Sequence, residues 1–146
     1  MDNEKYFLIK NIDELNKPAQ LLADFLLPKT IFLFSGKMSS GKTTFISEVL
    51  KLNNYTGVTS PTYAFHNTYK LSSIVTVHHL DLHRIKTIDD LESLGLWDLF
   101  EQNSEDIFFI EWAARLQTDE LPMNFKIIRV SIVLNNFNER EIKITF

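Results

Sequence analysis

The order of apolar and polar residues along this chain predicts alternating strands and helices. The continuous apolar runs at residues 30–35 (TIFLFS) and 106–112 (DIFFIEW) are typical of strands buried on both faces of a sheet. Residues 42–52 (KTTFISEVLKL) repeat apolar side chains at helical spacing, which predicts a helix soon after the first of these strands.

Shorter patterns complete the predicted fold. Further strands are expected at residues 5–10, 62–69, 74–80, 127–134 and 141–146, and further helices at 87–94 and 96–102. Another helix precedes Pro28, and its start is open: near Asn16 with Pro18 in the first turn, or at Asn11 with a kink. This order predicts an α/β fold with a mostly parallel central sheet, flanking helices and antiparallel closing strands.

Composition narrows the class of protein. The 146 residues, of which 45% are hydrophobic, are expected to form one domain over residues 1–146. Because the chain has no cysteine, disulfides, thiolate nucleophiles and cysteine-bound zinc are excluded. We find no signal-peptide pattern and no apolar run near the roughly 20 residues that span a bilayer, so a cytoplasmic protein without membrane contact is expected. A net charge of -4 argues against an extended surface for nucleic acid.

One short stretch carries the clearest chemistry. Gly36, four residues, then Gly41-Lys42-Thr43 stand between a predicted strand and a predicted helix, which is the context of a phosphate-binding loop. In such a loop backbone amides surround the phosphates, Lys42 reaches the β- and γ-phosphates, and the Thr43 hydroxyl binds Mg²⁺. The alternative is a strand-to-helix turn with incidental glycines. The candidate nucleotide contacts are Gly36, Lys37, Met38, Ser39, Ser40, Gly41, Lys42, Thr43 and Thr44.

Two acidic residues are expected near this loop. Asp81 follows one predicted strand and Glu111 lies near the end of another, and ligands bind outside the carboxyl ends of parallel strands. We interpret Lys42, Asp81 and Glu111 as the catalytic set, with Thr43, Asp81 and Glu111 around the metal. The alternative is that each acid caps a helix or pairs with an arginine. Arg84 could contact phosphate or pair with Asp81, and we favour the pair.

Other residues have weaker interpretations. His78 and His79 are neighbours in a strand, so they are expected on opposite faces rather than as joint metal ligands. Trp112 would either cover the site or fill the core.

The sequence favours ATP over GTP. The one Asn-Lys pair, Asn16-Lys17, precedes the loop and is followed by Pro18-Ala19, so the guanine-specific Asn-Lys-x-Asp element is absent. Loop residues near the first strand and first helix are candidates for adenine contacts, without a choice among them. Two other functions stay open: a nucleotide-sensing binding module with little hydrolysis, and a small kinase.

Five elements in order resemble the TsaE (YjeE) family of small bacterial ATPases. They are the loop from Gly36 to Thr44, Ser60-Pro61-Thr62-Tyr63, His79-Leu80-Asp81-Leu82-His83-Arg84, Leu94-Gly95-Leu96 and Ile110-Glu111-Trp112. The resemblance runs over most of the chain. Within the loop, the family's glycine-like position is Ser39 here and its usual acid is Lys37, and the family's tyrosine before Arg84 is His83.

The resemblance implies a function in tRNA modification. It implies a P-loop ATPase with ATP and Mg²⁺ as cofactors, weakly active alone, that drives turnover of a transferase formed by TsaB-like and TsaD-like proteins in threonylcarbamoyladenosine synthesis. Contact with tRNA would then be indirect, through that complex. It further implies that Asp81 and Glu111 belong to the metal and γ-phosphate site, and that residues 59–63 form a switch-like loop near the phosphates.

Overall fold

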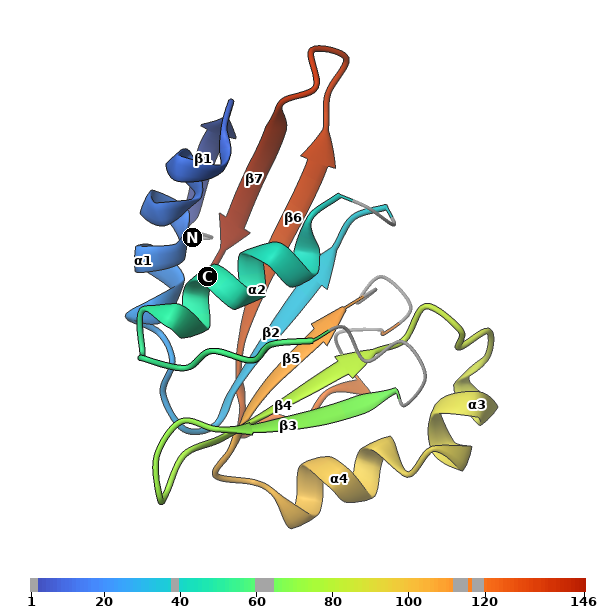
Figure 1. Ribbon diagram of the computed structural model, residues 1–146. Helices are drawn as coiled ribbons and strands as arrows, with labels where there is room; N and C mark the ends of the chain where they lie inside the picture. Colours follow the sequence, from blue (N-terminus) through green and yellow to red (C-terminus); the bar gives the residue numbers. More distant parts are fainter. Residues whose placement is uncertain (1–2, 38–39, 60–64, 112–115, 117–119) are drawn as a thin grey trace.

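A seven-stranded sheet forms the centre of the molecule in a computed structural model that describes residues 3–37, 40–59, 65–111, 116 and 120–146 (Figure 1). The strands are β1 (Glu4–Ile9), β2 (Thr30–Ser35), β3 (His66–Lys70), β4 (Thr76–Asp81), β5 (Ile107–Glu111), β6 (Lys126–Leu134) and β7 (Arg140–Thr145). The helices are α1 (Asn16–Ala23), α2 (Lys42–Lys51), α3 (Ile88–Ser93) and α4 (Leu96–Gln102), with a 3₁₀ helix η1 (Ile12–Leu15) before α1.

The strands follow the order β1-β7-β6-β2-β5-β4-β3 across the sheet. The four central strands β6, β2, β5 and β4 are parallel, so their carboxyl ends share one edge. Strands β1 and β7 close one side and β3 closes the other by antiparallel pairing. This arrangement confirms the predicted mixed α/β fold.

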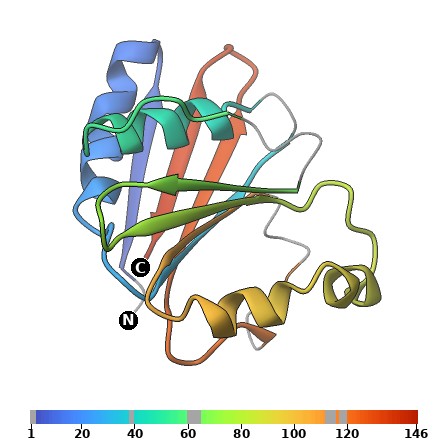
Figure 2. The same ribbon diagram turned by 60° about the horizontal axis from the view of Figure 1, so that its bottom comes forward.

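Helices cover both faces of the sheet, and the period-two alternation of the strands separates two cores (Figure 2). In β2, Phe32 and Phe34 pack toward α1 and α2, whereas Ile31 and Leu33 pack toward α3 and α4. Because both faces are covered, all four side chains are 5% exposed or less, as the apolar run predicted.

The open choice for the first helix is settled by α1, which begins at Asn16 with Pro18 in its first turn. Amides in the first turn have no acceptor within the helix, so the missing N–H of proline costs nothing there. The predicted strand at residues 62–69 is confirmed from His66, while its first residues at 62–64 lie outside the described part. Within the described residues, none of the helices is long and apolar enough to cross a membrane.

Candidate functional site

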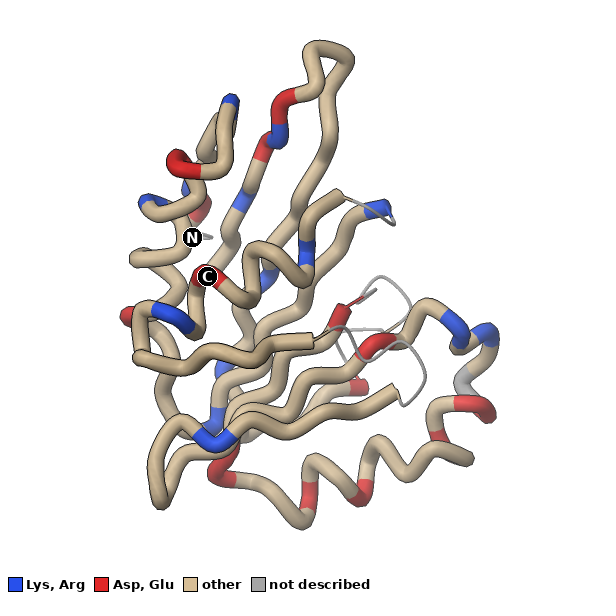
Figure 3. The backbone as a smooth tube through the Cα atoms, in the orientation of Figure 1, with Lys and Arg blue, Asp and Glu red and all other residues tan. Residues whose placement is uncertain are grey.

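The two predicted acids end neighbouring parallel strands and lie directly opposite each other. Asp81 is the last residue of β4, Glu111 is the last residue of β5, and the two are register partners. Ile107 and Phe109 pack toward α1 and α2, so alternation directs Glu111 to the face where α2 begins. Figure 3 shows acidic residues at the ends of β4 and β5 beside a basic residue at the start of α2.

The loop between β2 and α2 has a shape that only glycine permits at its two ends. Gly36 has φ +152°, and a Cβ there would lie 2.6 Å from the Ile132 carbonyl oxygen and 2.7 Å from Ser40 Oγ. Gly41 has φ +103° and is the N-cap of α2, where it supplies no side-chain acceptor to the first-turn amides. An anion held by these amides would also gain from the helix dipole. Two predicted contacts, Met38 and Ser39, lie outside the described residues.

Lys42 turns its ammonium group into the loop. The side chain is 5% exposed, and Nζ donates to the carbonyl oxygens of Gly36 at 2.6 Å and Lys37 at 3.4 Å. Burial lowers the pKa of Lys42, while the charges of Glu111 and Asp81 act in the opposite direction. A desolvated ammonium group in this position is an electrostatic partner for an incoming phosphate.

The rest of the loop is held by a strand that sequence analysis did not connect to it. Arg140, at the start of β7, donates from Nε to the Ser40 carbonyl oxygen at 2.8 Å. The Ser40 hydroxyl is buried and has no hydrogen-bond partner among the described residues. A buried, unpartnered donor beside the glycine cradle fits a loop shaped for an anion. Arg140 and Ser40 are 100 positions apart in the sequence, so no local sequence pattern could predict this contact.

The Glu111 carboxylate is held from two sides. Thr43 Oγ1 lies 3.4 Å from Glu111 Oε1, and His79 Nε2 lies 2.5 Å from Glu111 Oε2. Glu111 and His79 are 3% and 0% exposed, so the pair is shielded from solvent. The sequence alone predicts no such contact for His79, because the spacing of a single strand does not reveal which residue of the next strand faces it.

Asp81 has a different partner from the expected one. Its Oδ1 accepts from the His83 backbone amide at 3.0 Å and lies 2.9 Å from His83 Nδ1. Arg84 is exposed, and among the described residues it is His83 that lies beside Asp81. The predicted pair of Arg84 with Asp81 is therefore wrong: the backbone turn after β4 brings residue 83 back over the carboxylate.

The oxygen atoms at this edge of the sheet are suitable ligands for a hard metal ion. Thr43, Asp81 and Glu111 offer hydroxyl and carboxylate oxygens, which Mg²⁺ prefers. Among the described residues, no cluster of three or more His, Cys, Asp or Glu side chains could hold a metal. The oxygens of Thr43, Asp81 and Glu111 are of the type that Mg²⁺ takes as ligands.

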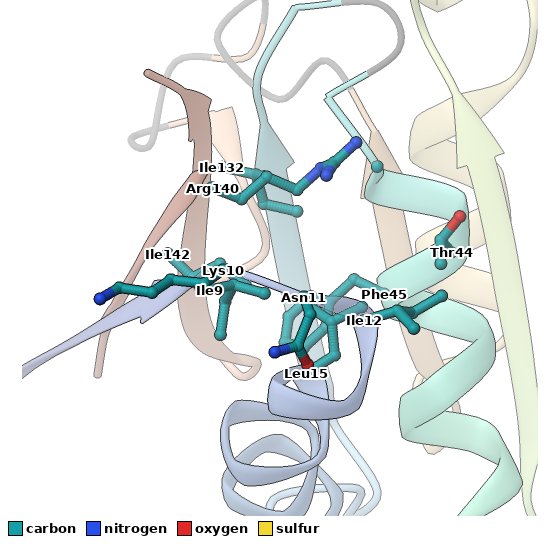
Figure 4. A pocket seen from close by; sticks show the side chains of 11 residues that line it. Ile9, Lys10, Asn11, Ile12, Leu15, Thr44, Phe45, Ile132, Arg140 and Ile142 are labelled. Carbon is teal, nitrogen blue, oxygen red and sulfur yellow. The ribbon is translucent and has the colours of Figure 1, made fainter. Parts of the chain in front are cut away.

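A pocket of about 180 Å³ opens on the other side of the first turn of α2 (Figure 4). Its lining is mostly apolar, with a few polar residues. The lining residues are Ile9, Lys10, Asn11, Ile12, Leu15, Gly41, Thr44, Phe45, Ile132, Arg140 and Ile142. The pocket thus joins the end of β1 and η1, where adenine contacts were expected, to the candidate phosphate loop.

The adjacent histidines face opposite sides of the sheet, as predicted. His79 faces α2, whereas His78 stacks on Phe108 of the other core. His78 Nε2 lies 2.8 Å from Asp106 Oδ2, and its Nδ1 lies 3.0 Å from His66 Nε2. His78 is thus part of the packing on the face of the sheet that α3 and α4 cover. The other prediction on this edge, Trp112, lies outside the described residues.

Comparison with known proteins gives one consistent family. A family model described as "Threonylcarbamoyl adenosine biosynthesis protein TsaE" matches residues 9–142. Proteins named "tRNA threonylcarbamoyladenosine biosynthesis protein TsaE" are similar: that of Rickettsia felis is 35% identical over 73% of this chain, and that of Rickettsia bellii is 30% identical over 83%. The match spans 61% of the R. felis protein and 85% of the R. bellii protein.

A solved structure supports the fold independently. The crystal structure of Bacillus subtilis YdiB superposes with a TM-score of 0.73, covers 99% of this chain and 86% of that one, and is 21% identical. At that identity the likeness speaks for the fold alone. The family match over nearly the whole chain establishes that the chain belongs to the TsaE family of threonylcarbamoyl adenosine biosynthesis proteins.

Proposed function

We propose that this protein is a Mg²⁺-dependent ATPase that supports threonylcarbamoyladenosine modification of tRNA. The observation that carries the proposal is the meeting of Lys42, Thr43 and Glu111 at the uncapped start of α2. The phosphates would lie against the first-turn amides of α2, with Lys42 on the β- and γ-phosphates. Lys42 would exchange its bonds to the loop carbonyls for bonds to phosphate, which is a charge-assisted pairing.

Thr43, Asp81 and Glu111 would hold the metal and the attacking water. Bound Mg²⁺ would neutralise charge on the β- and γ-phosphates. Thr43 would bind the metal directly, because its hydroxyl lies at the start of α2, where the phosphates would lie. Glu111, fixed by His79, would orient water through its Oε1, and Asp81, fixed by His83, would support the metal shell.

The pocket beside Gly41 and Thr44 supports a place for the adenosine. It is contiguous with the phosphate loop and lies on the side of α2 away from Glu111. Apolar walls with a few polar groups are typical of sites for a flat heterocycle. Ile12 and Leu15 would cover one face of the base, and Asn11 would offer polar contacts at its edge.

The role in the modification pathway rests on the family. Its members carry the name of tRNA threonylcarbamoyladenosine biosynthesis, and the present chain matches their sequences over most of its length. We propose that ATP hydrolysis drives repeated turnover of a transferase made of TsaB-like and TsaD-like subunits. The net charge of -4 fits a subunit that reaches tRNA only through these partners.

The test compares two lysines of the same helix. Lys42→Ala is expected to weaken Mg-ATP binding about 30-fold or more, since a charge-assisted bond contributes about 2 kcal/mol. Lys51→Ala, at the exposed end of α2, is the matched control and is expected to bind as the wild type does. Binding is measured by calorimetry, and phosphate release is measured with and without the TsaB–TsaD pair.

Each rival function gives a different result. Unchanged binding and turnover of Lys42→Ala in both conditions would contradict the site assignment. Tight ATP binding with turnover insensitive to Glu111→Gln would indicate a nucleotide-sensing module. Phosphate found on an organic acceptor, rather than free in solution, would indicate a kinase.

A further inference from the structure

A chain of hydrogen bonds runs from the buried candidate site to the exposed segment that follows α2. Glu111 Oε2 lies 2.5 Å from His79 Nε2, and His79 Nδ1 lies 2.8 Å from the Tyr69 hydroxyl. That hydroxyl lies 2.9 Å from the Thr59 carbonyl oxygen and 3.4 Å from the Thr59 amide nitrogen. Tyr69, His79 and Glu111 are each 3% exposed or less, so water does not compete for the bonds among these three side chains, whereas Thr59 at the outer end is exposed.

The sheet brings these residues together by alternation. Tyr69 pairs with Val77 across β3 and β4, and Val77, His79 and Glu111 share the face toward α2. The far end of the chain is fixed by Asn67, whose Nδ2 lies 3.3 Å from both the carbonyl oxygen and the hydroxyl of Thr59. Three strands thus contribute one line of contacts, and Thr59 marks its outer end.

Each hydrogen bond in this chain needs one donor and one acceptor, and the single hydroxyl proton of Tyr69 has two possible acceptors. In the tautomer whose Nε2 donates to the Glu111 carboxylate, Nδ1 of the His79 ring is the acceptor. Tyr69 then carries a single proton and faces two acceptors, His79 Nδ1 and the Thr59 carbonyl. Any shift of Thr59 away from Tyr69 would leave that proton to His79 alone.

We propose that Tyr69 and His79 are positioning residues that hold the Glu111 carboxylate beside Thr43 and couple it to the position of the chain at Thr59. The inference rests on the proposed function, because it assigns Glu111 to the hydrolytic site. Coupling of this kind is reciprocal, so a change at Glu111 alters the hydrogen bonds of Thr59, and a change at Thr59 alters the hold on Glu111.

The first test separates positioning from binding. Tyr69→Phe removes the hydroxyl and keeps the ring, and it is expected to lower kcat for ATP about tenfold with KM within about threefold, as outer-shell partners of a site do. Tyr55→Phe is the matched control, because that ring packs against Tyr69 at 5.2 Å and its hydroxyl takes part in none of these bonds. In the Glu111→Gln background, Tyr69→Phe is expected to have no further effect on kcat.

The second test needs no nucleotide. Hydrogen exchange of the Thr59 amide, followed by NMR, is expected to change at least threefold in Glu111→Gln, and not to change when Tyr69→Phe is already present. Asn67→Ala acts at the outer end of the chain on a half-buried residue, so it keeps the core intact and is expected to speed the same exchange.

The outcomes are distinguishable. If the wild type neither binds nor hydrolyses ATP, the proposed function fails, and the exchange data alone decide the coupling. If the wild type is active but Tyr69→Phe matches Tyr55→Phe in kcat, or its effect adds fully to that of Glu111→Gln, the coupling is overturned. The coupling is also overturned if the hydrogen-exchange rate of the Thr59 amide is the same in the wild type, in Glu111→Gln and in Asn67→Ala.

Discussion

Replacing Gly36 by alanine is expected to damage both the fold and nucleotide binding. The new Cβ would lie 2.6 Å from the Ile132 carbonyl oxygen and 2.7 Å from Ser40 Oγ. The serine hydroxyl can rotate away, but the carbonyl belongs to the backbone of β6 and cannot. The loop would therefore have to move, and with it the Gly36 carbonyl that accepts from Lys42 Nζ.

The expected cost follows from conformation and overlap. Alanine at φ +152° is strained by about 1–3 kcal/mol, and the steric overlap adds about 1–3 kcal/mol. Alanine also lowers the conformational entropy of the unfolded chain, which stabilises the folded state by about 0.4–1 kcal/mol. We expect a net loss of about 1–6 kcal/mol in the free energy of unfolding, and an affinity for Mg-ATP at least tenfold weaker.

Gly95→Ala is the matched control. Gly95 also has positive φ, +72°, but a Cβ there would meet no atom within 4 Å. Its left-handed conformation alone costs about 1–2 kcal/mol, so the net loss is expected near 1 kcal/mol, with nucleotide affinity unchanged. Urea unfolding and calorimetric titration of both variants check the difference. Equal destabilisation by the two alanines would refute the steric reasoning, and unaltered affinity in Gly36→Ala would refute the role of the loop.

Three further predictions test the surroundings of the site. Arg140→Ala removes the bond to the Ser40 carbonyl and is expected to weaken ATP binding about fivefold in titrations, whereas no change would show that β7 does not support the loop. His66 has its pKa lowered to about 4, chiefly by burial, so the unfolded chain takes up the proton first and stability falls as pH drops from about 6.5 toward 4. Between pH 7 and 5 this amounts to about 2 kcal/mol in urea unfolding, and His66→Asn should flatten the dependence. Chelation of Mg²⁺ is expected to weaken ATP binding about tenfold or more, because Glu111 and Asp81 then face the phosphates unscreened; affinity independent of Mg²⁺ would contradict their assignment.

Local sequence patterns were sufficient for the elements and for part of the site. The glycines, Lys42 and Thr43 are contiguous with β2 and α2, so strand, loop and helix could be predicted together. Asp81 and Glu111 could be placed at one edge because parallel strands share their carboxyl ends. Each of these inferences needs only neighbours in the chain and one general rule of parallel sheets.

The partners of these residues could not be predicted, since they depend on register and on distant strands. His79 lies 32 positions from Glu111, and Arg140 lies 100 positions from Ser40. Nothing in the spacing of β4 tells which residue of β5 faces it until the sheet is assembled. The expected contact of Arg84 with Asp81 was wrong for a related reason, because the turn geometry after β4 decided in favour of His83.

The same alternation that builds the core also fixes the chemistry of the site. In β5, Phe109 packs toward α1 and α2 while Phe108 packs toward α3 and α4, and both are fully buried. A slip of one residue would exchange these phenylalanines and turn Glu111 away from Thr43. Because such a slip puts one phenylalanine where the other stood, apolar burial of β5 alone opposes it only weakly, and the ladders to β2 and β4 on either side hold the register. The position of the carboxylate is therefore set by the register of β5 between β2 and β4, and the bonds from His79 and Thr43 then fix its orientation.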